Sequence, residues 1–290
     1  MTAAGVAFMN QNSRILIAGG LTLLALTATV AVFRLRLHVT NTRALFDARL
    51  LRSPGESLRK RLEQLNEKLM YCIALFVVGP ILFAWATPGF PDQLSTGLLA
   101  AVVGLGLVPV MLVAMKYRNY SLGLAGERAV GEELNQLMLE GCRVFHDYLG
   151  GSKWNIDHIV IAPSSVYAIE TKTRSKRRAP RGKLDQEVIY DGAKLLFPRY
   201  SSAREPEQAR RNAADLSREL TSATGEPVKV KPILTFPGWY INRRGKSDVT
   251  VVNPKEIRRV IISNDPPRLS PQQIQRIAHQ IEQKCRDVGF

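Results

Sequence analysis

The sequence predicts an α/β protein in which N-terminal transmembrane α-helices precede a mixed β-sheet flanked by helices. Two observations support this fold class. Long uncharged runs occur only within the first 115 of the 290 residues. In the remainder, β-branched runs of strand length alternate with amphipathic helical patterns. We therefore divide the chain into a membrane region, residues 1–116, and an α/β domain, residues 117–290.

Three apolar runs are predicted to cross a bilayer, at about residues 15–33, 70–87 and 97–115. The first contains nineteen uncharged residues, which is about 28 Å as a helix and close to the hydrocarbon thickness of a membrane. Residues 88–96 favour a tight hairpin between the second and third runs. One alternative is a cleaved signal peptide at the first run, although no cleavage-type sequence precedes Arg34 and Arg36. The other, burial in a soluble core, requires more chain than 115 residues supply.

The distribution of basic residues predicts the orientation of these spans. Nine lysines and arginines lie between the first and second runs, and none lies in residues 88–96. Under the positive-inside rule this places the N-terminus outside and residues 117–290 in the cytoplasm of a multi-pass cell (inner) membrane protein. The net charge is +15, of which residues 116–290 carry +10, with 30 basic against 20 acidic side chains. That excess favours contact with a polyanion.

The segment most informative about chemistry runs from Asn155 to Lys172. Two apolar β-branched runs flank Pro163-Ser164-Ser165, which predicts a β-hairpin. If the turn centres near Pro163 and Ser164, residue numbers of cross-strand partners sum to about 327, and Asp157 lies opposite Glu170. Because side chains alternate along a strand, Glu170 and Lys172 point to the same face. The hairpin therefore brings two carboxylates and one ammonium group together.

Two facing carboxylates repel each other, and a hard divalent cation such as Mg²⁺ (or Mn²⁺) relieves that repulsion by taking oxygen ligands from both. Such a cation can acidify a water molecule and neutralise charge that builds on a phosphodiester, while Lys172 orients the water or stabilises the departing charge. The predicted chemistry is hydrolysis of a nucleic-acid backbone. The competing interpretation is a solvated strand face whose surface ion pair contributes almost nothing.

Several blocks resemble the nuclease-related domain NERD, a branch of the PD-(D/E)xK nuclease superfamily with a restriction-endonuclease-like fold. They are Gly123-Leu124-Ala125-Gly126-Glu127-Arg128-Ala129-Val130, the Asp157 strand, Glu170-Thr171-Lys172, Pro206-Glu207-Gln208 and Phe236-Pro237-Gly238-Trp239. The resemblance covers a core of about residues 119–255. It implies that Asp157 and Glu170 hold Mg²⁺, that Lys172 is the catalytic lysine, that Glu127 is the acid of the first helix, and that Gln208 supports the site.

Simpler interpretations remain open for other polar residues. Glu127 could be an acid near a helix N-terminus, where it complements the helix dipole. Gln208 could be an exposed residue on a helix whose buried stripe contains Ala209, Ala213, Leu216 and Leu220. Strand alternation turns His158 away from Asp157, so we interpret it as structural. His146 and Asp147 could simply end a strand, and Leu134, Leu137 and Met138 are expected in the core.

A basic cluster follows the predicted hairpin. We expect it to track the phosphates of a bound nucleic acid, although a solvated loop or a patch against anionic lipid fits the same composition. Its members are Arg174, Lys176, Arg177, Arg178, Arg181 and Lys183. Aromatic residues are sparse there, so neither base stacking nor sequence readout is predicted.

The remaining elements complete the predicted domain. We expect strands at Glu187–Tyr190, at Val228–Thr235 with Pro232 near an edge or a strand start, and at Val249–Val252. Helices are expected at residues 254–262 and 271–285, the latter capped by Ser270. The three cysteines lack metal-type spacing, and no phosphate-binding glycine loop is present.

Three functions fit the sequence. The first is a membrane-anchored Mg²⁺-dependent endo- or exonuclease acting on DNA more than on RNA. A homodimer is compatible with this function, since cleavage of both strands often needs two copies. The second is a catalytically weak or inactive membrane-tethered nucleic-acid-binding module. The third is a membrane scaffold whose basic surface contacts lipid or a protein partner.

Overall fold

The computed structural model describes residues 50–86, 92–151, 154–176, 186–262 and 266–288. The chain divides into two compact units: the first contains Glu63–Tyr117, and the second contains Arg49–Leu62 together with Arg118–Val288. Two long helices contribute to both units, α2 (Glu56–Ala86) and α3 (Asp92–Asn135). The second unit carries all the strands and the candidate site.

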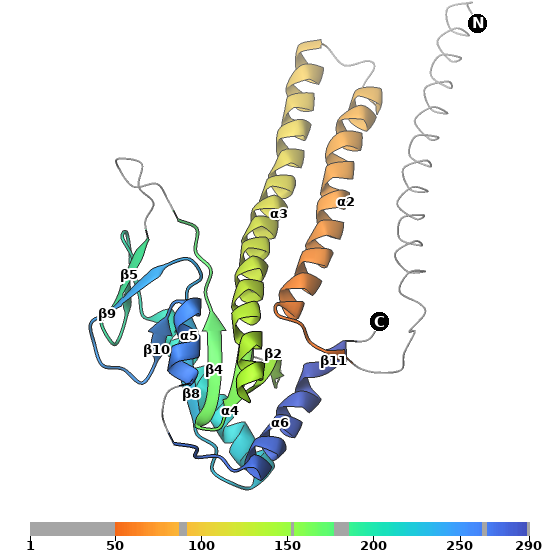
Figure 1. Ribbon diagram of the computed structural model, residues 1–290. Helices are drawn as coiled ribbons and strands as arrows, with labels where there is room; N and C mark the ends of the chain where they lie inside the picture. Colours follow the sequence, from red (N-terminus) through yellow and green to blue (C-terminus); the bar gives the residue numbers. More distant parts are fainter. Residues whose placement is uncertain (1–49, 87–91, 152–153, 177–185, 263–265, 289–290) are drawn as a thin grey trace, which may run out of the picture. The chain divides into compact units, whose positions relative to one another are not determined.

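In the first unit, α2 and α3 lie side by side (Figure 1), and Gly106 packs against the Phe76 ring, whose Cδ2 would be 3.3 Å from an added Cβ. Many large apolar side chains are exposed on these helices, Leu75 and Leu105 each at 74%. Within the described residues, however, no helix combines the length and apolar character that crossing a membrane requires.

The three predicted spans are therefore unsupported. Residues 15–33 lie outside the described residues, and the other two runs form parts of α2 and α3. Of the hairpin predicted at residues 88–96, residues 92–96 belong to α3, which begins at Asp92, and residues 88–91 lie outside the described residues. The same helix continues past Tyr117 to Asn135, so the predicted third span and the first helix of the α/β domain form one continuous element.

The second unit is built on a mixed five-stranded sheet in the order β10-β8-β4-β3-β2. Strands β2, β3 and β4 are antiparallel neighbours, whereas β4, β8 and β10 run parallel. The strands are β2 (Arg143–Gly150), β3 (Trp154–Ala162), β4 (Ser165–Thr171), β8 (Val230–Thr235) and β10 (Thr250–Val252). This confirms the α/β class with a mixed sheet flanked by helices.

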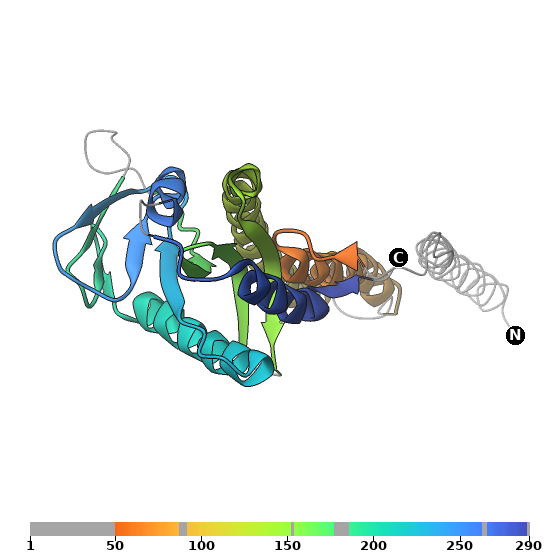
Figure 2. The same cartoon turned by 60° about the horizontal axis from the view of Figure 1, so that its bottom comes forward.

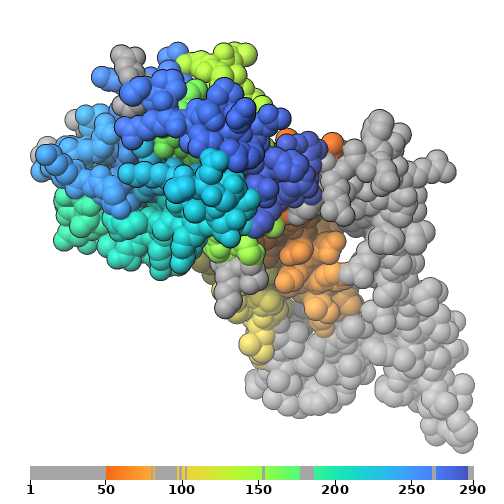
Figure 3. Space-filling model, turned by 90° about the horizontal axis from the view of Figure 1, so that it is seen from below, coloured from red at the N-terminus to blue at the C-terminus, as the bar shows by residue number. Residues whose placement is uncertain are grey.

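Helices cover both faces of this sheet (Figures 1 and 2). One face packs against α4 (Arg204–Thr224) and α6 (Pro271–Cys285), and this core includes Ile159, Ala168 and Leu216. In the space-filling view, α4 and α6 lie side by side over that face (Figure 3). The other face packs against the C-terminal end of α3, the 3₁₀ helix η1 (Gln136–Glu140) and α5 (Pro254–Ile261).

Smaller sheets complete the second unit. A four-stranded sheet has the order β7-β6-β5-β9, formed by β5 (Glu187–Tyr190), β6 (Leu195–Leu196), β7 (Ser201–Ser202) and β9 (Tyr240–Arg243). A two-stranded sheet joins β1 (Leu50–Leu51) to β11 (Arg286–Val288). The sequence predicted β5 but not β6, β7 or β9. Strands of two residues, such as β6 and β7, are too short to give a periodic signal.

One sequence-based expectation about the core holds in part and another needs correction. Pro232 is not on an edge strand, since β8 lies between β10 and β4, but it lies near the start of β8, which was the other expected position. The ladder between β8 and β10 starts only after it, at Ile233. Met138 is 51% exposed, whereas Leu134 and Leu137 are buried as predicted. The helix tightens into η1 from Gln136, which changes the side-chain spacing.

Candidate active site

The predicted hairpin register is confirmed. Ala162 pairs with Ser165 and His158 pairs with Ile169, so partner numbers sum to 327 and the turn is Pro163-Ser164. One further step along this ladder places Asp157 beside Glu170. Odd-numbered β3 residues such as Ile159 and even-numbered β4 residues such as Ala168 pack in the core beneath α4 and α6. Glu170 lies on this face, where α4 contacts it, and Lys172 contacts Glu170. Asp157 is held at the end of β4 by the amide of Thr171.

Asp157 is a buried carboxylate at the start of the hairpin, with 5% of its surface exposed. Its Oδ2 accepts a hydrogen bond of 2.7 Å from the amide of Thr171, which fixes the carboxylate against the end of β4. Burial raises the pKa of Asp157 well above its ordinary value, and the carboxylates of Glu170 and Glu127 raise it further. The position therefore favours the protonated, neutral carboxyl unless a cation stabilises the ionised form.

Glu170 is held by three side chains. Its Oε1 accepts from Lys172 Nζ at 2.5 Å and from Gln208 Nε2 at 2.7 Å, and its Oε2 accepts from Asn212 Nδ2 at 3.0 Å. The same Asn212 nitrogen donates to the carbonyl of Asn155, also at 3.0 Å. Gln208 and Asn212 are one turn apart on α4, so this helix supports the carboxylate from above the sheet. Gln208 is not simply an exposed residue.

Asn212 was missed by the sequence reasoning. It lies four residues after Gln208 and is buried, and that spacing on one helix face was the available signal. Burial alone would lower the pKa of Lys172, but the carboxylates of Glu170 and Asp157 outweigh it, so the pKa rises. Lys172 is therefore a firmly protonated cation beside the two acids.

Glu127 reaches this region from α3, on the other side of the sheet. A Cβ added to the preceding Gly126 would lie 2.0 Å from Thr173 Oγ1, so only glycine lets α3 approach the chain just beyond Lys172 this closely. Burial raises the pKa of Glu127 to about 8, with contributions from Asp147 and Glu170. The helix-dipole interpretation of Glu127 is wrong, because the residue lies near the C-terminal end of α3.

The described residues contain no group of three or more His, Cys, Asp or Glu side chains arranged to hold a metal ion. The donor set nevertheless has the chemistry that Mg²⁺ prefers, since Asp157 and Glu170 present carboxylate oxygens side by side. Burial is the main cause of the raised pKa values of Glu127 and Asp157, and repulsion by neighbouring carboxylates, including that of Glu170, raises both further. A divalent cation would offset this repulsion.

Only two residues of the predicted basic cluster lie within the described residues. Arg174 is exposed, and its guanidinium pairs with the buried Glu205 at the start of α4 (2.5 Å). Lys176 packs near Gly238, with its Nζ 3.8 Å from a Cβ added there. Arg177, Arg178, Arg181 and Lys183 lie outside the described residues.

His146 and Asp147 do not end a strand, as they lie inside β2. His146 Nδ1 is 2.9 Å from His158 Nδ1, and His146 Nε2 is 3.0 Å from Asn135 Oδ1. Burial lowers the pKa of both histidines, to about 4 for His146, so the pair is neutral. His158 is accordingly structural, as the strand alternation predicted.

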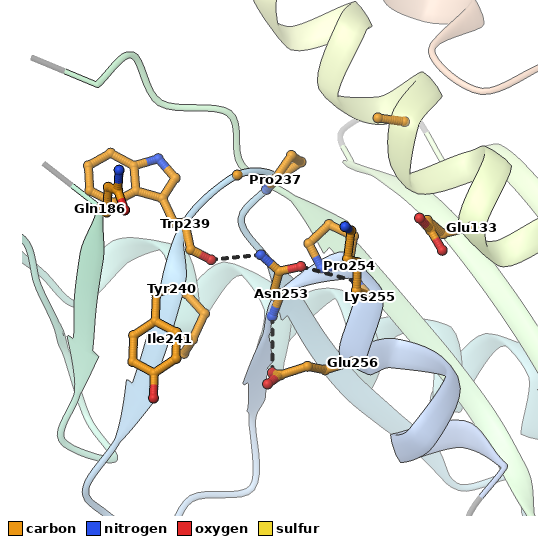
Figure 4. Close-up of a pocket in the computed structure, with 12 residues that line it drawn as sticks. Glu133, Gln186, Pro237, Trp239, Tyr240, Ile241, Asn253, Pro254, Lys255 and Glu256 are labelled. Carbon is orange, nitrogen blue, oxygen red and sulfur yellow. Dashed lines mark hydrogen bonds between the residues drawn. The ribbon is translucent and has the colours of Figure 1, made fainter. Parts of the chain in front are cut away.

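A separate groove of ≈ 580 Å³ lies between the 237–241 turn, α3 and the start of α5 (Figure 4). Asn253 organises one wall, donating to the carbonyl of Trp239 (2.7 Å) and accepting from the amide of Lys255 (3.1 Å). Trp239 Nε1 in turn donates to the Arg174 carbonyl at 3.3 Å, which ties this wall to the segment after Lys172. Asp157, Glu170 and Lys172 do not line the groove.

Comparison with known proteins finds a family match over part of the chain. Residues 122–237 match the family profile described as NERD: Nuclease-related domain. This range contains Glu127, Asp157, Glu170, Lys172, Gln208 and Asn212. The match indicates a nuclease-like domain with nucleic acid as its substrate or partner.

Similarity to individual proteins is much weaker. The chain is similar to a solved structure titled "The structure of Pyrococcus Furiosus SfsA in complex with Ca2+", with 17% identity and a TM-score of 0.21. That similarity covers 42% of this chain and 45% of the other. No curated protein matches.

Proposed function

We propose that the protein is a metal-dependent nuclease that hydrolyses phosphodiester bonds of nucleic acid, DNA rather than RNA. The observation that carries the proposal is the buried Asp157 beside Glu170, with Lys172 held 2.5 Å from the second carboxylate. An isolated buried carboxylate is unfavourable unless it is paired or binds a cation. A pair of acids with a lysine at one end of a sheet is therefore better explained by chemistry than by folding stability.

In this proposal Asp157 and Glu170 hold Mg²⁺ or Mn²⁺. When bound, the cation would polarise the phosphate and lower the pKa of a water molecule. Lys172 stabilises negative charge on the phosphate oxygens through its ammonium group, which its raised pKa keeps protonated. Gln208 and Asn212 keep the Glu170 carboxylate in a fixed orientation. Glu127, on α3, is the third acid of the proposed site, and its pKa of about 8 keeps it mostly protonated at neutral pH when no cation is bound.

In this proposal, charge complementarity accounts for substrate binding. Arg174 and Lys176 follow Lys172 directly in the chain, at the point where β4 has ended. In the proposal they contact backbone phosphates together with Arg177, Arg178, Arg181 and Lys183. Contacts of this kind are independent of sequence and weaken as salt increases.

Cleavage assays test the enzymatic proposal. Full-length protein is incubated with radiolabelled duplex and single-stranded DNA, and with RNA, in Mg²⁺ or in EDTA. We expect Mg²⁺-dependent cleavage that Asp157→Asn and Lys172→Met each reduce by at least about a hundredfold. The matched control is Glu207→Gln, an exposed acid on α4 next to Gln208. Equal activity in wild type, Asp157→Asn and Lys172→Met would refute the proposal.

A nucleic-acid-binding module without turnover is the second candidate. The observation in its favour is that Lys172, Gln208 and Asn212 already donate three hydrogen bonds to Glu170, using lone pairs that a cation would need. This function predicts salt-sensitive DNA binding that Glu170→Ala leaves intact, with no cleavage by the wild type. Cleavage that requires Glu170 would exclude it.

We also propose that residues 1–116 anchor the protein in the cell (inner) membrane, with the nuclease-like domain in the cytoplasm. Support comes from the apolar runs in the sequence and from the exposed apolar side chains of α2 and α3, among them Leu75, Leu105 and Met111. Extraction of cell membranes with alkaline carbonate tests this: an anchored protein stays in the pellet. Release of the full-length chain into the supernatant would contradict anchoring.

A further inference from the structure

The N-terminal segment, residues 50–62, belongs to the same compact unit as the candidate site although it precedes the matched family region, residues 122–237. It is joined to the end of the chain, since Leu50 pairs with Val288 and Leu51 with Arg286. The amide of Arg52 continues this connection by donating to the carbonyl of Cys285 at 2.9 Å. Residues 50–62 and the end of the chain both lie outside the part of the sequence that the family profile covers.

A buried ion pair anchors the N-terminal segment to β2. Arg52 Nη1 lies 3.0 Å from Asp147 Oδ2, and both side chains are almost fully buried. The same Oδ2 accepts from the amide and the hydroxyl of Ser57, at 2.6 Å and 2.7 Å. Asp147 has a φ of 51°, the left-handed region that non-glycine residues seldom adopt. The surrounding contacts therefore hold Asp147 in an unfavourable backbone conformation, a feature often found beside functional sites.

The N-terminal segment also packs against the part of α3 that carries Glu127. A Cβ added to Gly131 would lie 2.4 Å from Pro54 Cγ, and one added to Gly123 would lie 3.1 Å from Leu58 Cδ1. Gly55, at a φ of +75°, faces Leu124 and Glu127, whose Oε2 would be 3.4 Å from an added Cβ. Glycines on α3 thus admit the segment on both sides of Glu127.

Gly126 performs the corresponding role on the other side of the helix, where it admits Thr173 at the end of β4. The turn of α3 around Glu127 is therefore held between the N-terminal segment and the chain that follows Lys172. Movement of either contact would change the position of the Glu127 carboxylate relative to Glu170 and Lys172.

We propose that Arg52 and Asp147 are positioning residues of the nuclease site: their ion pair fixes the N-terminal segment against α3 and so fixes the position of Glu127 on that helix. The proposal rests on the proposed function in so far as positioning affects cleavage. It extends the functional unit beyond residues 122–237 to include residues 50–62 and the C-terminal strand β11. A second measurement, hydrogen–deuterium exchange, examines the positioning without reference to activity.

Two variants of the full-length protein test the proposal. Arg52→Met removes the ion pair, and Gly131→Ala forces Pro54 away from α3 without altering charge. Gly104→Ala is the matched control, because it places the same methyl group on the same helix where nothing lies within 4 Å. The exchange of peptides from residues 122–135 is compared with that of peptides from α4, residues 204–224.

We expect both variants to accelerate exchange in residues 122–135 by about tenfold or more while α4 is unchanged, and the control to have no effect. For cleavage we expect kcat to fall by about tenfold or more with KM within about twofold. Unchanged exchange in residues 122–135, or an equal increase in α4, would overturn the positioning role. If Arg52→Met does not fold, Gly131→Ala decides the outcome. If the wild type does not cleave nucleic acid, the proposed function fails, and the exchange data still decide this proposal.

Discussion

The amide of Thr171 donates a 2.7 Å hydrogen bond to Asp157 Oδ2. This bond joins the Asp157 carboxylate to the backbone position between Glu170 and Lys172. Because the backbone of β4 fixes the amide, Asp157 has little freedom to turn away from Glu170. The two acids are thus kept close even without a cation, and their mutual repulsion is part of the folded state.

Asn212 should contribute more to stability than Gln208. Both donate to Glu170, but Asn212 is buried and also satisfies the Asn155 carbonyl, whereas Lys172 still holds Oε1 when Gln208 is removed. We expect Asn212→Ala to lower the free energy of unfolding by about 1–3 kcal/mol and Gln208→Ala by about 1 kcal/mol or less. Urea denaturation followed by circular dichroism measures both. A larger loss for Gln208→Ala would contradict this assignment.

The stability of the metal-free protein should fall as the pH rises. An acid whose pKa is higher in the folded than in the unfolded state binds its proton more tightly when folded, so unfolding releases a proton. For Glu127 the pKa rises from 4.5 to about 8, which places the loss of stability between these values. Asp157 acts in the same direction.

Thermal unfolding in EDTA across this pH range tests the prediction. Glu127→Gln should flatten the decline, and Glu207→Gln, the exposed control on α4, should leave it unchanged. An identical slope in Glu127→Gln and wild type would show that Glu127 is not the group responsible. Added Mg²⁺ should stabilise the wild type most at the alkaline end, because a cation favours the ionised carboxylates.

Gly126 should tolerate no side chain while Thr173 is present. The methyl group in Gly126→Ala would meet Thr173 Oγ1 at 2.0 Å and Thr173 Cβ at 3.2 Å, so α3 or the β4 end must shift. We expect a loss of about 1–3 kcal/mol of stability, as for other overpacked contacts. Thr173→Ala in the same chain should restore part of it, and Gly104→Ala serves as the control. Urea denaturation that detects no loss in Gly126→Ala would contradict the close approach.

The sequence was sufficient for the hairpin that carries Asp157, Glu170 and Lys172. Strand alternation and a two-residue turn together determine the register, because a slip of one residue would turn the apolar side chains of both strands to the wrong faces. The cap of α6 was equally readable, since Ser270 precedes a proline at the first helical turn. These features depend on neighbouring residues only.

Other features depend on contacts between distant parts of the chain. Arg52 and Asp147 are 95 residues apart, and neither has a local pattern that predicts the ion pair. The glycines of residues 123–131 were recognisable as a motif, but the partners they admit come from two distant parts of the chain: Pro54 and Leu58 from the N-terminal segment, and Thr173 from the end of β4. The continuity of α3 was also missed, because polar residues after Lys116 mask a helix whose first half is apolar.

A crystal structure of the protein soaked in Mn²⁺ tests the central claim most directly, since anomalous scattering locates the cation. The account predicts one Mn²⁺ coordinated by Asp157 and Glu170, with Lys172 Nζ moved away from Glu170 Oε1. The Mn²⁺ peak should be lost in Asp157→Asn. An intact Lys172–Glu170 pair with no anomalous density between the two acids would contradict the account.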